Sequence, residues 1–453
     1  MRRILLCIAL LTSHFSLLTA TAQGQADTLN HLSFGLQFLT HGETCGGGLP
    51  RSDGMPATED RSSFLLGRTR LMLDYTHQGL EAYAMVQNNK VWGADGNQKL
   101  NLYEGWLKMT AKNGLFAQVG RVALAYDDER IIGPNDFAMA AASHDVLRLG
   151  YEGHGHQVHA ILAYNQNDDD VYDGSYYIDG AQDYKTMQTV WYHYDVPKIP
   201  LGASLLFMNV GLQAGEYTEI NNKKVVSEGN PPCTVNQQVY GGYLNFHPKR
   251  LTLEGSYYRQ EGKSVDKAMG PNPIEAWMAS VKATVSLTDN YGFEVGYDYL
   301  SGDDYMPVLY SGSFGMPRHE VIKGFMPLYG SHTKFYGIMD YYYESSYNNG
   351  FTPGLQNAFV GVSGSFWDKL NAKVTYHYLA VTTDLHNLDR TLGHSVELEA
   401  RYKFSKEVSL SAGYTHMMGT ETMDRLKQGS ASKHARWGWF SLVFSPSKLT
   451  TKW

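Results

Sequence analysis

The sequence predicts an all-β protein: a transmembrane antiparallel β-barrel of about 18 strands, with short turns at one end and long loops at the other. Three observations indicate it. The chain opens with a secretory leader, apolar and polar side chains then alternate in segments of about ten residues, and connection lengths differ between the two ends. No apolar run of about 18 residues follows the leader, so no membrane-spanning helix is expected.

Residues 1–22 have the organisation of a signal peptide. Two arginines precede an apolar stretch, and the small residues ATA at 20–22 form a cleavage site. Polar residues interrupt the apolar stretch and leave it too short to span a bilayer comfortably. We therefore expect an exported protein in which residues 23–453 form one outer-membrane barrel.

The stretch SVELEARYKF at 395–404 shows the alternation clearly. Val396 and Leu398 lie on one face of an extended chain, whereas Glu397 and Arg401 lie on the other. A membrane wall with lipid outside and water inside would select this pattern. A soluble β-sandwich or propeller with one solvated face would select it too, so the local pattern leaves both open.

The connections favour the membrane barrel. Short turns are expected at 77–79, 113–114, 153–155, 198–202, 249–250, 289–290, 368–370 and 406–407. Long connections are expected at 42–61, 90–100, 127–145, 167–185, 216–237, 263–275, 302–355, 382–394 and 419–435. Outer-membrane barrels sort short periplasmic turns from long extracellular loops in this way, whereas a soluble sandwich has no reason to do so.

The alternating segments between these connections give an even number of strands, about 18. Ascending strands are expected near 32–41, 80–89, 115–125, 156–165, 203–215, 251–262, 290–301, 372–381 and 407–418, each followed by a descending one. The last strand, near 436–446, is aromatic and apolar. It could pair with the first strand and so leave the sheet without an edge.

Residues 120–152, GRVALAYDDERIIGPNDFAMAAASHDVLRLGYE, resemble the alginate-export family of outer-membrane porins, together with LNLYEGWLKM, KFYGIMDYYY and GLQNAFVGVS elsewhere. The shared pattern is a Gly-Arg pair ending a strand, an acidic-Arg-aliphatic-Gly stretch, an aromatic connection and an Asp-x-x-Arg entry to the next strand. The matching positions are Gly120, Arg121, Asp128, Arg130, Gly133, Phe137, Asp145 and Arg148. The resemblance implies a porin, with alginate as cargo.

The residues of this motif also carry a physical expectation. Strict alternation would turn Arg121 toward lipid, at a cost of about 2–4 kcal/mol at mid-membrane, and a bulge at Gly120 would turn it inward instead. One charge network is then expected where the third loop meets the wall. It would comprise Arg121, Arg130, Arg148, Asp128, Glu129 and Asp145. Such a network would either pin the loop or select the solute.

The longest connection, 302–355, is rich in aromatic residues and methionine, and we expect part of it to fold into the lumen and narrow the pore. The alternative is an outward cap on neighbouring loops. If the connection folds into the lumen, its candidate pore-facing charges are His319, Glu320, Lys323 and Asp340.

Pore-lining or selectivity candidates over the whole chain are Arg68, Arg70, Glu104, Arg121, Arg130, Asp145, Arg148, Glu254, Lys282, Asp340, Glu397 and Arg401. The positions expected to point inward carry ten acidic and eight basic side chains in total. A channel for a polyanionic uronate should be strongly basic. The near balance favours neutral or zwitterionic solutes.

Cys45 and Cys233 lie in loop-like segments rich in Gly or Pro and are a candidate disulfide, with two thiols as the alternative. No metal site is expected, because the aspartates of 165–180 do not fit an EF-hand and His156 and His159 point to opposite faces of a strand.

The absence of a basic run excludes nucleic acid as a partner, and no motif marks a catalytic residue, so no enzyme activity and no cofactor are expected. We expect a passive channel for small hydrophilic solutes or oligosaccharides in the outer membrane of a Gram-negative-type cell. The alternative is a non-conducting barrel that serves as a structural or docking partner in a surface complex.

Overall fold

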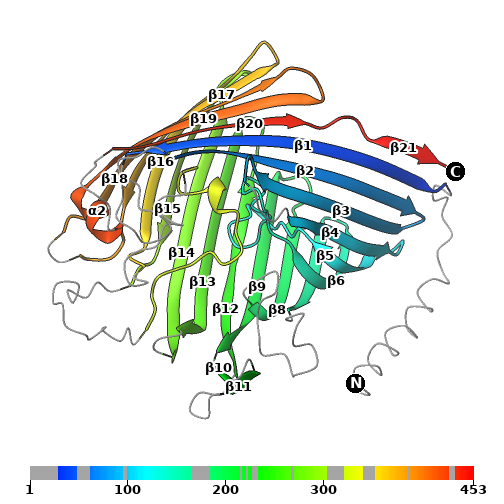
Figure 1. Ribbon diagram of the computed structural model, residues 1–453, viewed down its shortest axis with the longest axis horizontal. Helices are drawn as coiled ribbons and strands as arrows, with labels where there is room; N and C mark the ends of the chain where they lie inside the picture. Colours follow the sequence, from blue (N-terminus) through cyan, green and yellow to red (C-terminus); the bar gives the residue numbers. More distant parts are fainter. Residues whose placement is uncertain are drawn as a thin grey trace.

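The structure is a computed structural model that describes residues 29–47, 62–94, 99–165, 184–214, 217–220, 223–226, 233–266, 270–303, 321–339, 352–385, 388–427 and 434–453. Within these ranges, eighteen antiparallel strands join edge to edge into a closed ring (Figure 1). The predicted fold class and strand number are confirmed. The proposed signal peptide lies outside the described residues.

The first half of the ring consists of strands joined in sequence order. They are β1 (His31–Gly46), β2 (Ser62–His77), β3 (Leu80–Val91), β4 (Lys99–Thr110), β5 (Leu115–Val122), β6 (His144–Gly153), β7 (His156–Tyr164), β8 (Tyr184–Asp195) and β9 (Leu201–Ala214).

The second half continues in the same way. It comprises β12 (Cys233–Phe246), β13 (Leu251–Asp266), β14 (Gly270–Ser286), β15 (Tyr291–Leu300), β16 (Leu355–Phe366), β17 (Leu370–Ala380), β18 (Thr391–Lys403), β19 (Val408–Gly419) and β20 (His434–Phe444). A separate hairpin of β10 (Tyr217–Ile220) and β11 (Lys223–Val226) lies between β9 and β12.

The ring closes between its first and last strands. β20 pairs antiparallel with β1 from Phe38↔Phe444 to Gly46↔Arg436, so neither strand keeps a free edge there. After a break at 445–448, the short strand β21 (Leu449–Lys452) pairs with the first residues of β1. The predicted closure by the aromatic last strand is therefore confirmed.

Helical structure is limited to the turn η4 (His332–Lys334) and α2 (Glu421–Lys427) in the part of the chain that the structure describes. No helix there is long and apolar enough to cross a membrane.

The two faces of the wall differ as the alternation predicts. Leu71 and Leu398 are about half exposed on the outer face, at 45% and 46%, while Arg68 and Glu397 on the inner face are buried. Exposed aromatic residues occur at both ends of the outer face: Tyr291, Trp367 and Phe404 near the turns, and Trp92, Tyr164 and Trp277 near the loops. An apolar belt bounded by aromatic residues is the surface that a barrel presents to lipid.

One expected connection is largely strand. The segment 263–275 was expected to be a loop, but β13 and β14 remain paired as far as Asp266↔Gly270. Pro271 and Pro273 of this segment lie beyond Met278↔Leu300, where the pairing of β14 with β15 ends, and such an edge tolerates proline.

The predicted disulfide between Cys45 and Cys233 is absent. Cys45 lies on β1 and Cys233 on β12, which are the first and tenth strands of the eighteen-strand ring. The two residues therefore lie on opposite walls, and a disulfide requires Cα atoms within about 7 Å.

Candidate functional site

Two segments fold into the ring and form its core. The first, 123–143, connects β5 to β6, and the second, 321–339, belongs to the longest connection (Figure 1). Their buried side chains, such as Ile132, Phe325 and Tyr336, join buried residues from the inner faces of the strands in one apolar cluster. The expectation that part of 302–355 folds inward is met by the described part, 321–339.

Contacts with several walls show that the first segment crosses the lumen. Asp127 accepts hydrogen bonds from Trp191 of β8 and Tyr258 of β13 at 3.0 and 3.3 Å. Further along, Asp136 forms ion pairs with Arg68 and Arg70 of β2, at 3.2 and 2.7 Å.

The two infolded segments are bound to each other. Ile132 and Tyr329 form a parallel bridge, and the Ser331 amide donates to the Glu129 carbonyl at 2.9 Å. The Ser331 hydroxyl also donates to the Glu129 carboxylate at 2.7 Å. At the far end, the Ile338 amide donates to Glu397 of β18 at 3.0 Å. The segments therefore act as one constricting body attached to the wall.

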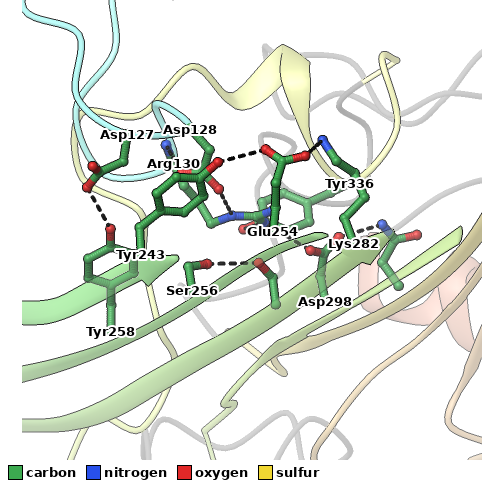
Figure 2. A network of polar contacts seen from close by, with 12 residues as sticks. Asp127, Asp128, Arg130, Tyr243, Glu254, Ser256, Tyr258, Lys282, Asp298 and Tyr336 are labelled. Atoms are coloured by element: carbon green, nitrogen blue, oxygen red, sulfur yellow. Dashed lines mark hydrogen bonds and ion pairs between the residues drawn. The ribbon is translucent and has the colours of Figure 1, made fainter. Parts of the chain in front are cut away.

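Arg130 is the charged centre of this body (Figure 2). Its guanidinium lies 3.1 Å from Asp128 and 3.1 Å from Asp298 of β15, and donates to the Tyr336 hydroxyl at 3.0 Å. The guanidinium carbon also lies 4.0 Å above the ring of Phe335. One buried cation thus joins both infolded segments to the wall.

The environment shifts the pKa values of several groups in these segments, including Arg130, Tyr336 and Asp127. Burial alone would lower the pKa of Arg130, but Asp298, Tyr336 and Asp128 outweigh it and hold that pKa above its ordinary value. Burial raises the pKa of Tyr336. Burial also raises the pKa of Asp127, and hydrogen bonds to its carboxylate offset part of the effect.

The wall opposite the infolded segments carries a ladder of polar contacts. Glu254 of β13 accepts from the Tyr243 hydroxyl at 2.8 Å and forms a 2.6 Å ion pair with Lys282 of β14 (Figure 2). Lys373 of β17 pairs with Glu294 of β15 at 2.7 Å. β13 and β14 are neighbours, whereas the Glu294–Lys373 pair reaches across β16, which lies between β15 and β17.

A cavity of about 550 Å³ lies between this wall and the infolded segments. Its lining includes eight carboxylates and four cationic side chains: Asp128, Glu129, Asp136, Glu254, Glu294, Asp298, Glu397 and Glu399, with Arg130, Lys282, Lys334 and Lys373. We call it the acidic cavity. The near balance counted from the sequence does not hold here, because alternation cannot show which inward residues the loops leave accessible.

Glu397 and Glu399 form no direct ion pair with a lysine or arginine of this lining, although Lys373 lies opposite Glu399 on the neighbouring strand. All four cations form ion pairs with other carboxylates of the cavity, and Asp136 pairs with the arginines of β2. In the described part of the chain, no lysine or arginine lies within 4.0 Å of either glutamate, although His377 lies 3.5 Å from Glu397. The cavity therefore attracts positive charge.

The other candidates lie at separate places. Glu104 accepts from the Ala123 amide at 3.2 Å, where the first infolded segment leaves the wall. Arg148 donates to the Tyr126 hydroxyl at 3.4 Å. Arg401 is exposed near the turns, with the Ser409 hydroxyl at 3.4 Å. Asp340 lies outside the described residues, as do His319 and Glu320 of the same connection.

The predicted bulge at Gly120 and the single charge network do not occur. β5 pairs with β4 and β6 without a register shift, so Arg121 stays on the outer face and forms a bidentate pair with Asp145, at 2.6 and 2.9 Å. Both lie where the strands meet the loops, and pairing offsets part of the cost of outward charge. A Cβ on Gly120, whose φ is +127°, would lie 2.2 Å from the Gly105 carbonyl oxygen.

Several important residues were not on the list of candidates from the sequence. Asp298 was counted as inward but not singled out, and Asp136, Phe137 and Tyr336 were not recognised as pore-lining. The alternation of RWGWF at 436–440 could have placed Trp437 on the inner face. No local pattern gives the partners of a loop residue.

Comparison with known proteins gives the class of fold. No family model matches the chain, and no curated protein matches it. Three solved structures from Pseudomonas aeruginosa are similar. OccK5 (OpdH) has 12% identity and a TM-score of 0.57, and the match covers 92% of this chain and 98% of that one. OpdL has 13% identity and a TM-score of 0.56, with 93% of this chain and 99% of that one covered, and OccK2 (OpdF) has 11% identity and a TM-score of 0.57, with 94% of this chain and 100% of that one covered. The shared fold is the eighteen-strand barrel of outer-membrane porins.

Proposed function

We propose that this protein is a passive outer-membrane channel for small hydrophilic solutes, and that it prefers cations to anions. The observation that carries the proposal is the acidic cavity between the infolded segments and the wall. Its lining contains more carboxylates than cationic side chains, and Glu397 and Glu399 contribute to the excess negative charge. Clefts lined by one sign of charge concentrate ions of the opposite sign. The similar porins support a channel through the fold they share.

The resemblance to the alginate-export family would add alginate as cargo. The porin fold agrees with that resemblance, but the charge of the cavity argues against the cargo, because carboxylates would repel a polyuronate. We therefore propose cationic or zwitterionic solutes in its place.

The test is the reversal potential of the purified protein in a planar bilayer under a KCl gradient. A shift toward the potassium equilibrium potential is expected, and Glu397→Gln with Glu399→Gln should reduce it. Steep anion selectivity would contradict the cation preference and favour an anionic cargo. A protein that never conducts at any voltage would favour the docking barrel.

A further inference from the structure

A second cavity, of about 310 Å³, adjoins the acidic cavity. The infolded segments supply Phe137, Met139 and Met339 to its lining, and the wall supplies Leu66 and Trp437. Most of its surface is therefore apolar or aromatic. We call it the side pocket.

The two cavities meet at a shared boundary. Phe137, Thr333 and Ile338 line both of them. The amide of Ile338 donates to Glu397 at 3.0 Å, so a carboxylate without a lysine or arginine partner lies one hydrogen bond from the entrance to the side pocket. A molecule that spans the boundary would meet apolar groups on one side and negative charge on the other.

The side pocket offers mainly apolar contact, and its carboxylate is engaged by hydrogen bonds within the wall. Its one carboxylate, Glu43, accepts from the Trp437 indole at 2.8 Å and lies 2.9 Å from His41. Phe137 stands edge-on to Trp437 and Trp439, with ring centroids 6.1 and 5.2 Å apart. These contacts fix the aromatic wall and keep the carboxylate engaged.

We propose that the side pocket holds the apolar part of an organic cation whose charged group rests against Glu397 and Glu399. The inference rests on the proposed channel function and narrows its solutes to amphipathic ammonium compounds with an aryl or branched alkyl group. Burial of the aryl or alkyl group against the aromatic wall would stabilise such a solute in addition to the attraction between its charge and the two glutamates. A simple cation of the same charge would gain only the electrostatic part.

Block of the channel current by two probes tests this. Benzyltrimethylammonium and tetramethylammonium carry the same charge, and the benzyl compound should block the open channel about tenfold or more tightly. Leu66→Ser should bring the ratio of the two blocking constants toward one. Glu397→Gln, the control for charge, should weaken block by both probes and leave the ratio high. Equal block of the unaltered channel would overturn the inference.

The reaction rate of the Cys45 thiol gives a second readout, because Cys45 lines the side pocket. Benzyltrimethylammonium should slow the reaction of Cys45 with a methanethiosulfonate reagent, while tetramethylammonium at equal concentration should not. Cys233, on the opposite wall, is the internal reference whose reaction rate should stay constant. Absence of selective protection overturns the inference. If the protein never conducts, the proposed channel function fails together with this inference. If the channel prefers cations but is blocked equally by the two probes, only this inference fails.

Discussion

At the scale of single residues, the constriction depends on one buried cation. Arg130 contacts Asp128 on its own segment, Tyr336 on the other and Asp298 on the wall. A buried ion pair is weak support for stability in itself, but removing one partner leaves an uncompensated buried charge. Arg130 therefore matters for where the segments lie more than for whether the barrel closes.

Replacing Arg130 by Gln should loosen the infolded segments while the barrel remains intact. Asp128 and Asp298 would lose their buried cation, which should lower the free energy that holds the segments in place by about 3–5 kcal/mol. Hydrogen exchange at the amides of Tyr329 and Ser331, which donate to the first segment, would measure this cost. Arg250→Gln is the control, because its pair with Asp289 is exposed on a turn, and it should leave this exchange unchanged.

At the scale of elements, 321–339 stays in the lumen through contacts with several strands and with 123–143. Its own regular structure is only the turn His332–Lys334 within the described residues. Tertiary contacts, and not local propensity, therefore hold the segment in its position.

Acid should weaken this position through His332. Burial lowers the pKa of His332 to about 4, from 6.5. The docked segment keeps the imidazole neutral, whereas an undocked segment takes up the proton first. Stability of the docked state should therefore fall as the pH drops below 6.5, with the loss complete below about 4. Hydrogen exchange of 321–339 against pH measures it, and an equal pH dependence in His332→Gln would assign the effect to other groups.

Removal of the segment should widen the pore. Replacing 321–339 by a short Gly-Ser linker should raise single-channel conductance, because the constricting body loses one of its two halves. A linker replacement of the β10–β11 hairpin, which pairs only with itself, is the matched control. Conductance that stays the same after removal of 321–339 would mean that the segment does not limit the current.

At the scale of the whole molecule, the ring presents apolar side chains to its surroundings and encloses charged ones. A soluble protein rarely exposes so extensive an apolar belt. Closure through β1 and β20 also leaves no unpaired strand edge along the main wall, which a bilayer requires.

A charge on the outer face should therefore destabilise the barrel in lipid. Leu398→Lys should lower the free energy of unfolding by up to about 2–4 kcal/mol in phospholipid vesicles, depending on depth. Leu449→Lys is the matched control, because Leu449 is 75% exposed on β21, outside the main wall. Denaturant titration in vesicles measures both, and a neutral effect at Leu398 would mean that this face meets water.

The sequence by itself determined the barrel. Lipid and water impose a period of two on every strand, so Leu398 and Glu397 could be assigned to opposite faces without any tertiary knowledge. The turns also follow from local chemistry, as at Gln78 and Gly79, both with positive φ. An even strand count and closure by the last strand followed from the same rules.

Only the tertiary structure decided the site. Long-range contacts bring Arg130 to Asp298, place Ile338 beside Glu397 and put Cys45 and Cys233 on opposite walls. A strand's environment repeats every two residues and can be seen in a short window. A loop that crosses a lumen finds its partners through the closed ring, whose geometry no local window contains, so the charge that the pore presents emerges only after folding.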